Sequence, residues 1–169
     1  SLNKGEFIEI AAGSEVSVDF DAGKLVTGFL NLEISGGATA EITLEAAECY
    51  ELPPIDVPWL RDKKRRDQPI GQDLYGDPDS YLVAGVGSRG APEVYQPYWF
   101  RTFRFLRVRI RTSIEPVVIQ ALDFQVHNYP LDITGSFETT DQFHQNLWEV
   151  SKHTLLNCMH ETFEDCPFY

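Results

Sequence analysis

The chain has 169 residues and a formal net charge of -12, with 43% hydrophobic and 12% aromatic side chains. This length and apolar content suffice to bury a hydrophobic core, so the composition excludes an intrinsically disordered chain. The negative charge removes the attraction to phosphate backbones on which non-specific nucleic-acid binding depends, so we expect no nucleic-acid partner.

The predicted strands occupy residues 7–126, where apolar and polar residues mostly alternate. That period gives each strand one buried and one solvated face. In FLNLEIS and AEITLE the alternation is regular, and Gly36-Gly37 between them predicts a turn that pairs the two as a hairpin. In FRTFRFLRVRIR the alternation slips at Phe105-Leu106, which indicates a bulge or a strand covered on both faces. The sequence therefore predicts a mainly β fold, an antiparallel, jelly-roll-like β-sandwich over residues 1–128.

Residues 51–98 interrupt this pattern with a segment rich in Pro, Gly and Asp. Loops of this length in compact domains are usually functional or lie against another domain. The basic cluster at residues 61–66 lies among prolines, which favours a solvated loop over a phosphate-binding patch. Four aromatic residues have rings that could stack on a sugar, although packing in a core or a domain interface is their commoner role: Trp59, Tyr75, Tyr98 and Trp99.

The period changes near Tyr129. Apolar residues then recur at three- and four-residue intervals and form one helical stripe: Phe143, Leu147, Val150, Thr154, Leu155 and Cys158. Thr139 with Gln142 predicts a capping box, and Pro167 excludes a continuation, so the pattern predicts a helix from about residue 140 to about residue 161. With no second helical segment to match it, the stripe either packs on the sandwich or belongs to a helical domain that begins in residues 129–169.

The three cysteines, Cys49, Cys158 and Cys166, are too few and too scattered for a disulfide framework, so the cellular compartment stays open. No stretch approaches the ~20 apolar residues of a membrane span, so we expect no membrane partner. Residues 153–166 contain His, Cys, Asp and Glu, but their spacing matches no compact zinc motif, and we expect no metal. Cys166, with histidines upstream, is a candidate nucleophile, but a structural cysteine is the simpler interpretation.

Carboxylates concentrate in the last nine residues, ETFEDCPFY, where the predicted helix gives way to a turn: Glu161, Glu164 and Asp165. Hydrolysis of a glycosidic bond needs one carboxyl group to protonate the leaving oxygen and another to attack or to activate water. The alternative is a solvated acidic helix end, although carboxylates at a helix C-terminus are mildly unfavourable with the macrodipole. Carboxylate chemistry is therefore favoured over metal or cysteine chemistry.

The segment GSFETTDQFHQNLWEVSKHTLLNCMHETFEDCPFY resembles the start of the catalytic domain of bacterial α-L-rhamnosidases, family 78 of the glycoside hydrolases. Members of that family run from a β-sandwich through G-S-F-E-x-[ST]-[DN] into a helix and reach an Asp-Cys-Pro triplet. The stretch YWFRTFRFLRVRI also looks like an aromatic-rich strand that those enzymes carry before this junction. Cys166 is the cysteine of the triplet. Eight further positions match the two motifs: Gly135, Ser136, Phe137, Glu138, Thr140, Asp141, Asp165 and Pro167.

This resemblance implies an inverting glycosidase without an organic cofactor, whose catalytic domain is an (α/α) barrel of helical hairpins. Asp165 matches the aspartate that holds hydroxyls of the reacting rhamnose, and Glu164 beside it is a second substrate-binding candidate. The family's general acid, five positions after that aspartate, and its distant general base both fall beyond Tyr169. The resemblance therefore implies that this chain contains no catalytic residue, is inactive alone, and has a C-terminal catalytic domain as its intramolecular partner.

One position departs from the family pattern. The family usually places an arginine two residues after the proline, and Tyr169 stands there instead. A bidentate cation is thus replaced by a stacking and hydrogen-bonding ring, which alters how a sugar would be held. Two other functions stay open: a non-catalytic carbohydrate-binding module that uses the 51–98 loops, and an interaction domain whose C-terminal helix docks on a partner.

Overall fold

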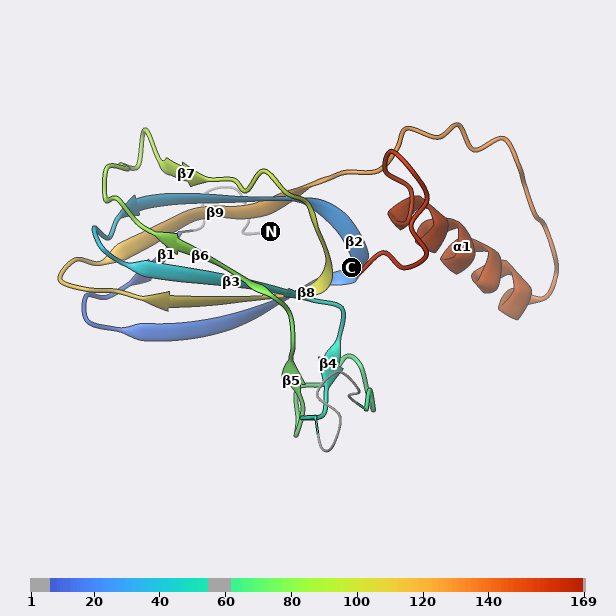
Figure 1. Cartoon of the computed structure of the whole chain (residues 1–169), viewed down its shortest axis with the longest axis horizontal. Coiled ribbons are helices and arrows are strands. Elements are labelled where there is room, and N and C mark those ends of the chain that lie inside the picture. The colour runs from blue at the N-terminus through green and yellow to red at the C-terminus, as the bar shows by residue number, and fades with distance from the viewer. Residues whose placement is uncertain (1–6, 55–61, 169) are drawn as a thin grey trace.

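The computed structural model describes residues 7–54 and 62–168. The chain is mainly antiparallel β-structure followed by one helix, as the sequence predicts, and Figure 1 shows the helix beside one end of the β-sandwich. The described elements, in chain order, are β1 (Ile8–Ile10), β2 (Glu15–Gly36), β3 (Glu41–Ala47), β4 (Tyr50–Glu51), β5 (Asp73–Leu74), β6 (Pro78–Leu82), β7 (Glu93–Tyr95), β8 (Arg101–Arg111), β9 (Val117–Val126) and α1 (Gln142–Asn157).

The sandwich consists of two layers that share the long strand β2. The first half of β2 pairs with β8, β8 pairs with β3, and β3 pairs with β6, all antiparallel. The second half, from Gly28 to Gly36, pairs with β9 on one edge and with β7 on the other, and β1 extends the layer beyond β9. Strand β2 therefore curves round one end of the sandwich and joins the layers, which is visible in Figure 1.

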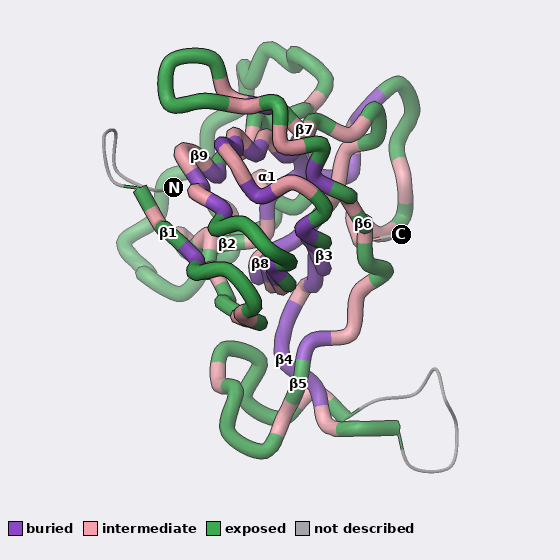
Figure 2. The backbone as a smooth tube through the Cα atoms, turned by 90° about the vertical axis from the view of Figure 1, so that its left-hand side faces the viewer, coloured by how far each residue is buried: buried purple, intermediate pink, exposed green. Residues whose placement is uncertain are grey.

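The core lies between these layers and takes its side chains from the alternate positions that the sequence marks as inward-facing. Figure 2 shows the buried parts of β2, β3 and β8 gathered in the middle of the molecule. Burying each such side chain contributes about 1.5–3 kcal/mol. The core residues include Leu30, Leu32, Ile34, Ile42, Leu44, Val108, Ile110, Val117 and Ile119.

The predicted hairpin around Gly36-Gly37 is wrong. Among the described residues no ladder joins β2 to β3, and the turn instead carries the chain from one layer to the other. Both glycines have positive φ, and a Cβ on Gly37 would lie 2.2 Å from Cγ2 of Val117, so only glycine fits there. Two strands that face each other across a core show the same alternation as two strands that pair, so the pattern could not separate these cases.

The slip at Phe105-Leu106 marks a strand that is covered on both faces. Leu106 belongs to the main core, whereas Phe105 packs on the opposite face of β8 in a second cluster with Ala47, Tyr50 and Leu74. The bulge lies on the neighbouring strand: between Asp21 and Val26 the register of β2 against β8 shifts. The β4–β5 hairpin thus has a small apolar cluster of its own against the sheet.

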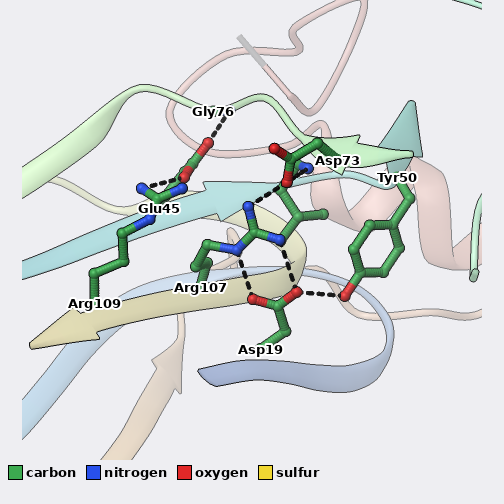
Figure 3. A network of polar contacts seen from close by, with 8 residues as sticks. Asp19, Glu45, Tyr50, Asp73, Gly76, Arg107 and Arg109 are labelled. Atoms are coloured by element: carbon green, nitrogen blue, oxygen red, sulfur yellow. Dashed lines mark hydrogen bonds and ion pairs between the residues drawn. The ribbon is translucent and has the colours of Figure 1, made fainter. Parts of the chain in front are cut away.

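An ion-pair network ties this hairpin to the outer face of the sheet (Figure 3). Arg107 donates two hydrogen bonds to Asp19, of 2.7 and 2.9 Å, and a further one to Asp73. The Tyr50 hydroxyl also donates to Asp19, at 2.7 Å. The Arg107 guanidinium holds the pKa of Asp19 below its usual range, despite partial burial of that carboxyl. The arginines of FRTFRFLRVRIR therefore act as cross-strand partners of carboxylates.

The basic cluster is a surface loop in its described part, residues 62–66, as the sequence predicts; Arg61 lies outside the described residues. Lys63 contacts Glu48 at 2.7 Å and Glu51 at 3.4 Å, and Arg66 contacts Glu48 at 3.8 Å. Lys63 and Arg66 thus have carboxylate partners on the same chain, which favours a structural role for them over a phosphate-binding patch.

Glu93 holds the loop after β6 in place through hydrogen bonds. Its carboxylate accepts hydrogen bonds from the Tyr81 hydroxyl at 2.6 Å and from the backbone N–H groups of Ala84, Gly85 and Val86 at 2.8, 2.9 and 3.1 Å. Burial raises the pKa of this carboxyl, but the four hydrogen bonds outweigh burial and leave the pKa lowered. The hydrogen bond to Glu93 raises the pKa of Tyr81 to about 12.

We expect Glu93→Gln to lower the free energy of unfolding by about 1–2 kcal/mol at neutral pH. A carboxyl whose pKa is lower in the folded state stabilises the fold above its unfolded pKa, and that stabilisation is lost as pH falls through the folded pKa. The difference in the free energy of unfolding between parent and variant should therefore shrink as the pH falls below 4.5, the ordinary pKa of this carboxyl. Urea unfolding of both proteins across this range measures it, and a difference that stays constant with pH would contradict the assignment.

Helix α1 is shorter than predicted at both ends. Its N-cap is Asp141, whose Oδ1 accepts from the Phe143 N–H at 2.9 Å, rather than Thr139. It ends at Asn157, four residues early, because His160 turns away to stack on Phe100 with ring centroids 4.3 Å apart. A tertiary contact thus overrides helix propensity at this end.

The apolar stripe of α1 does not pack on the sandwich, so that alternative is wrong. Phe143, Leu147 and Val150 are half or more exposed, and so is Leu155. The side of the helix that faces the sandwich is polar in its contacts and centres on Asn157, which is 1% exposed. No helix among the described residues has the length and apolar character needed to cross a membrane.

Candidate functional site

The turn that follows α1 places the two carboxylates predicted to bind substrate at the surface. The Glu164 N–H donates to the Cys158 carbonyl at 2.8 Å, and Met159 forms an isolated bridge with Phe163, so residues 158–164 fold back on themselves. Asp165 is exposed and Glu164 is half-buried. The tail forms no strand of the sandwich in its described part, up to residue 168, and Asp165 does not lie in an apolar interior.

Glu164 and Asp165 border an open depression of about 510 Å³ between the turn and the helix. In the described part of the chain, no hydrogen bond or ion pair engages the Asp165 carboxylate. An ionised carboxylate offers only acceptors, which suit the hydroxyl groups of a polar ligand. The other residues around the depression come from the turn and from α1: Val150, Ser151, Thr154, Leu155, Cys158 and Phe163.

Cys49 and Cys158 lie in surroundings typical of structural cysteines, whereas Cys166, the candidate nucleophile, is half-buried. Cys158 is buried, and burial, with Cys166 and the nearby acidic residues, raises the pKa of its thiol. Burial likewise raises the pKa of Cys49 to about 11. A thiol with a raised pKa is not a nucleophile at neutral pH. Within the described ranges, no three His, Cys, Asp or Glu residues lie close enough to hold a metal ion.

A second hollow lies between the sandwich and the C-terminal tail, with a volume of about 320 Å³. One wall is the segment Tyr75–Asp77, and another is the beginning of β8, where Arg101 and Thr102 follow Phe100. Phe168 of the tail and Ala46 of β3 complete the lining. This pocket brings together residues that are far apart in the sequence.

Neither a protein-family model nor a curated protein matches the chain. Solved structures do match. A rhamnosidase of glycoside hydrolase family 78 from Bacillus sp. GL1 aligns with 96% of the chain, with a TM-score of 0.69 and 25% sequence identity. The chain is similar to the family 78 rhamnosidases. A rhamnosidase from Klebsiella oxytoca, solved with rhamnose bound, aligns with 95% of the chain at a TM-score of 0.59 and 20% identity, which supports the fold alone.

This rhamnosidase-like chain spans only 15% of the length of the Bacillus enzyme and 30% of that of the Klebsiella enzyme. The resemblance predicted from the sequence is thus confirmed, and at 96% coverage it extends over the β-sandwich too.

Sequence reasoning found the carboxylates of this rhamnosidase-like chain but not its pocket. Of the aromatic candidates, Tyr75 lines the pocket, Tyr98 and Trp99 are exposed rather than in the core, and Trp59 lies outside the described residues. Asp77 and Arg101 were missed, because no local pattern links two polar residues of a loop and a strand. The only signal was the unusual composition of residues 51–98.

Proposed function

We propose that the chain is the β-sandwich, residues 1–128, and the beginning of the catalytic domain, residues 129–169, of a glycoside hydrolase. The enzyme hydrolyses terminal α-L-rhamnosyl or related glycosides with inversion of configuration. One observation carries the proposal: the likeness to a family 78 rhamnosidase covers 96% of the chain. On the turn after α1, Asp165 is exposed and has no partner in the described chain.

Asp165 and Glu164 bind the sugar in this proposal. A carboxylate at the rim of an open depression accepts hydrogen bonds from two adjacent hydroxyl groups, and it fixes the ring without taking part in bond cleavage. The general acid and the general base are contributed by residues beyond Tyr169, which itself lies outside the described residues. Inversion requires those two groups roughly 6.5–9.5 Å apart with water between them.

The exposed stripe of α1 supports a catalytic domain as the intramolecular partner. A helix with one apolar side buries that side against a neighbour, and here Phe143, Leu147 and Val150 are exposed. In the proposal, further helices of an (α/α) barrel cover the stripe. The helix then belongs to the catalytic domain and contacts the sandwich only through its polar side.

Hydrolysis of 4-nitrophenyl α-L-rhamnopyranoside by a polypeptide that contains the catalytic domain tests this proposal. We expect β-rhamnose as the first product in proton NMR spectra, because the reaction inverts the anomeric centre. The 169-residue chain by itself should release no nitrophenol, since it carries neither the acid nor the base. First formation of α-rhamnose, or hydrolysis by the isolated chain, would overturn the proposed mechanism.

The alternative, a carbohydrate-binding module without catalysis, is favoured by one observation. The pocket at Tyr75–Asp77 lies on the 51–98 loop that such a module would use. Saccharide binding by a polypeptide that carries the catalytic domain but hydrolyses no glycoside would decide for the module.

A further inference from the structure

We propose that the pocket between Tyr75–Asp77, the beginning of β8 and Phe168 is a second saccharide subsite, which binds one neutral pyranose unit. Its volume of about 320 Å³ lies in the range of small-molecule sites. The role of this pocket as a subsite for a longer substrate rests on the proposed glycosidase function. Sugar binding in the pocket is independent of that function.

The loop wall of the pocket is held rigidly by the sheet. The Gly76 N–H donates to Oε1 of Glu45 at 3.2 Å, and Glu45 is paired with Arg109 at 2.9 Å (Figure 3). A Cβ on Gly76 would lie 1.9 Å from the Ala46 carbonyl oxygen, so the loop approaches β3 as closely as a glycine backbone allows. A preformed wall reduces the ordering cost of binding.

The opposite wall is fixed by ring stacking. Phe100 stacks on His160 with centroids 4.3 Å apart and on Trp99 with centroids 5.0 Å apart. The rings of Tyr75 and Phe168 also line the pocket. Aromatic rings suit the C–H faces of a pyranose ring, and the polar groups beside them suit its hydroxyl groups.

Two polar side chains supply the specificity for hydroxyl groups. Asp77 is exposed, and in the described chain no hydrogen bond or ion pair holds its carboxylate. Arg101 is held by Asp79, to which its Nε donates at 3.0 Å and its Nη2 at 2.5 Å. The guanidinium has further N–H donors, so Arg101 and Asp77 offer donors and acceptors in one pocket.

The charges favour a neutral sugar over an anionic one. Asp79 already balances the charge of Arg101, and Asp77 adds an unpaired negative charge to a chain whose net charge is -12. A phosphate, sulfate or uronate would meet net repulsion, whereas the hydroxyl groups of a neutral pyranose donate to the free carboxylate.

Chain connectivity places the pocket near the first subsite. Phe168 follows Asp165 by three residues, a separation that an extended chain spans in about 11 Å at most. An oligosaccharide whose terminal sugar lies at Asp165 can therefore extend toward the pocket. The pocket would then select for the sugar that neighbours the cleaved bond or for one beyond it.

Titration of the 169-residue chain with methyl α-L-rhamnopyranoside and methyl β-D-glucopyranoside, followed by amide NMR shifts, tests the subsite. We expect at least one of them to shift Gly76, Asp77 and Thr102, and Asp77→Ala to weaken its binding about tenfold. The matched control is Asp132→Ala, an exposed aspartate away from the pocket, which should bind as the parent does. Galacturonate should bind more weakly than either neutral sugar.

The outcomes separate this inference from the proposed function. If neither glycoside shifts these amides, or if Asp77→Ala binds as tightly as Asp132→Ala, the subsite is refuted whatever the hydrolysis assay shows. Asp165→Asn should leave the shifts at Gly76 and Thr102 unchanged, and their loss in that variant would contradict a separate subsite. Binding in the pocket together with absent hydrolysis would retain the subsite and reject the glycosidase.

Discussion

Asp165→Asn is expected to lower kcat/KM on an α-L-rhamnoside by about a hundredfold or more in a polypeptide that carries the catalytic domain. Each hydrogen bond from a hydroxyl to an ionised carboxylate is worth about 1.5–3 kcal/mol, and the substitution weakens two of them. Because Asp165 is exposed and has no partner in the described chain, the change should leave the free energy of unfolding within about 0.5 kcal/mol. Steady-state kinetics and urea unfolding measure the two effects.

Glu161→Gln is the matched control for this experiment. Glu161 is exposed in the same turn, and it is not among the residues that border the depression. Its removal should change kcat/KM by less than about twofold, since it makes no contact with the sugar in this proposal. Parental kinetics in the Asp165 variant, or equal losses in both variants, would show that the aspartate does not hold the substrate.

The sequence predicted the sandwich because a strand between core and solvent must alternate. Leu30, Leu32 and Ile34 are inward-facing and fully or almost fully buried, as their spacing indicates. The same spacing does not determine which strand pairs with which. The predicted partner of residues 30–34, strand β3, lies in the other layer. Strand identity is a local property, whereas strand order depends on the global fold.

The candidate site also has a part that the local sequence predicts and a part that depends on the global fold. The position of Asp165 at an exposed turn followed from a helix that had to end before Pro167, which is local information. The choice of Asp141 over Thr139 as N-cap could not be predicted, because both residue types cap helices well. The pocket depends on contacts of Gly76 and Phe168 with distant strands, which no motif encodes.

The hydrogen bonds between α1 and the sandwich centre on Asn157, whose side chain is buried. Asn157 donates through Nδ2 to the Leu25 carbonyl at 2.9 Å, and His153 donates to the same oxygen through Nε2 at 2.6 Å. The backbone carbonyl of Asn157 also accepts from the Thr27 hydroxyl at 3.5 Å. Leu25 lies where the register of β2 shifts, so the strand irregularity presents a carbonyl that the ladder with β8 does not use.

We therefore expect Asn157→Ala to lower the free energy of unfolding of α1 by about 2–3 kcal/mol, from a lost hydrogen bond and a buried cavity. A helix of 16 residues with an exposed apolar side is marginal by itself, so its amides should lose hydrogen-exchange protection while those of β8 and β9 keep theirs. Asn146→Ala, on the exposed side of the same helix, should change protection little. Equal loss across helix and strands would mean that α1 and the sandwich unfold as one unit, and that the two proposed domains meet through more than this polar contact.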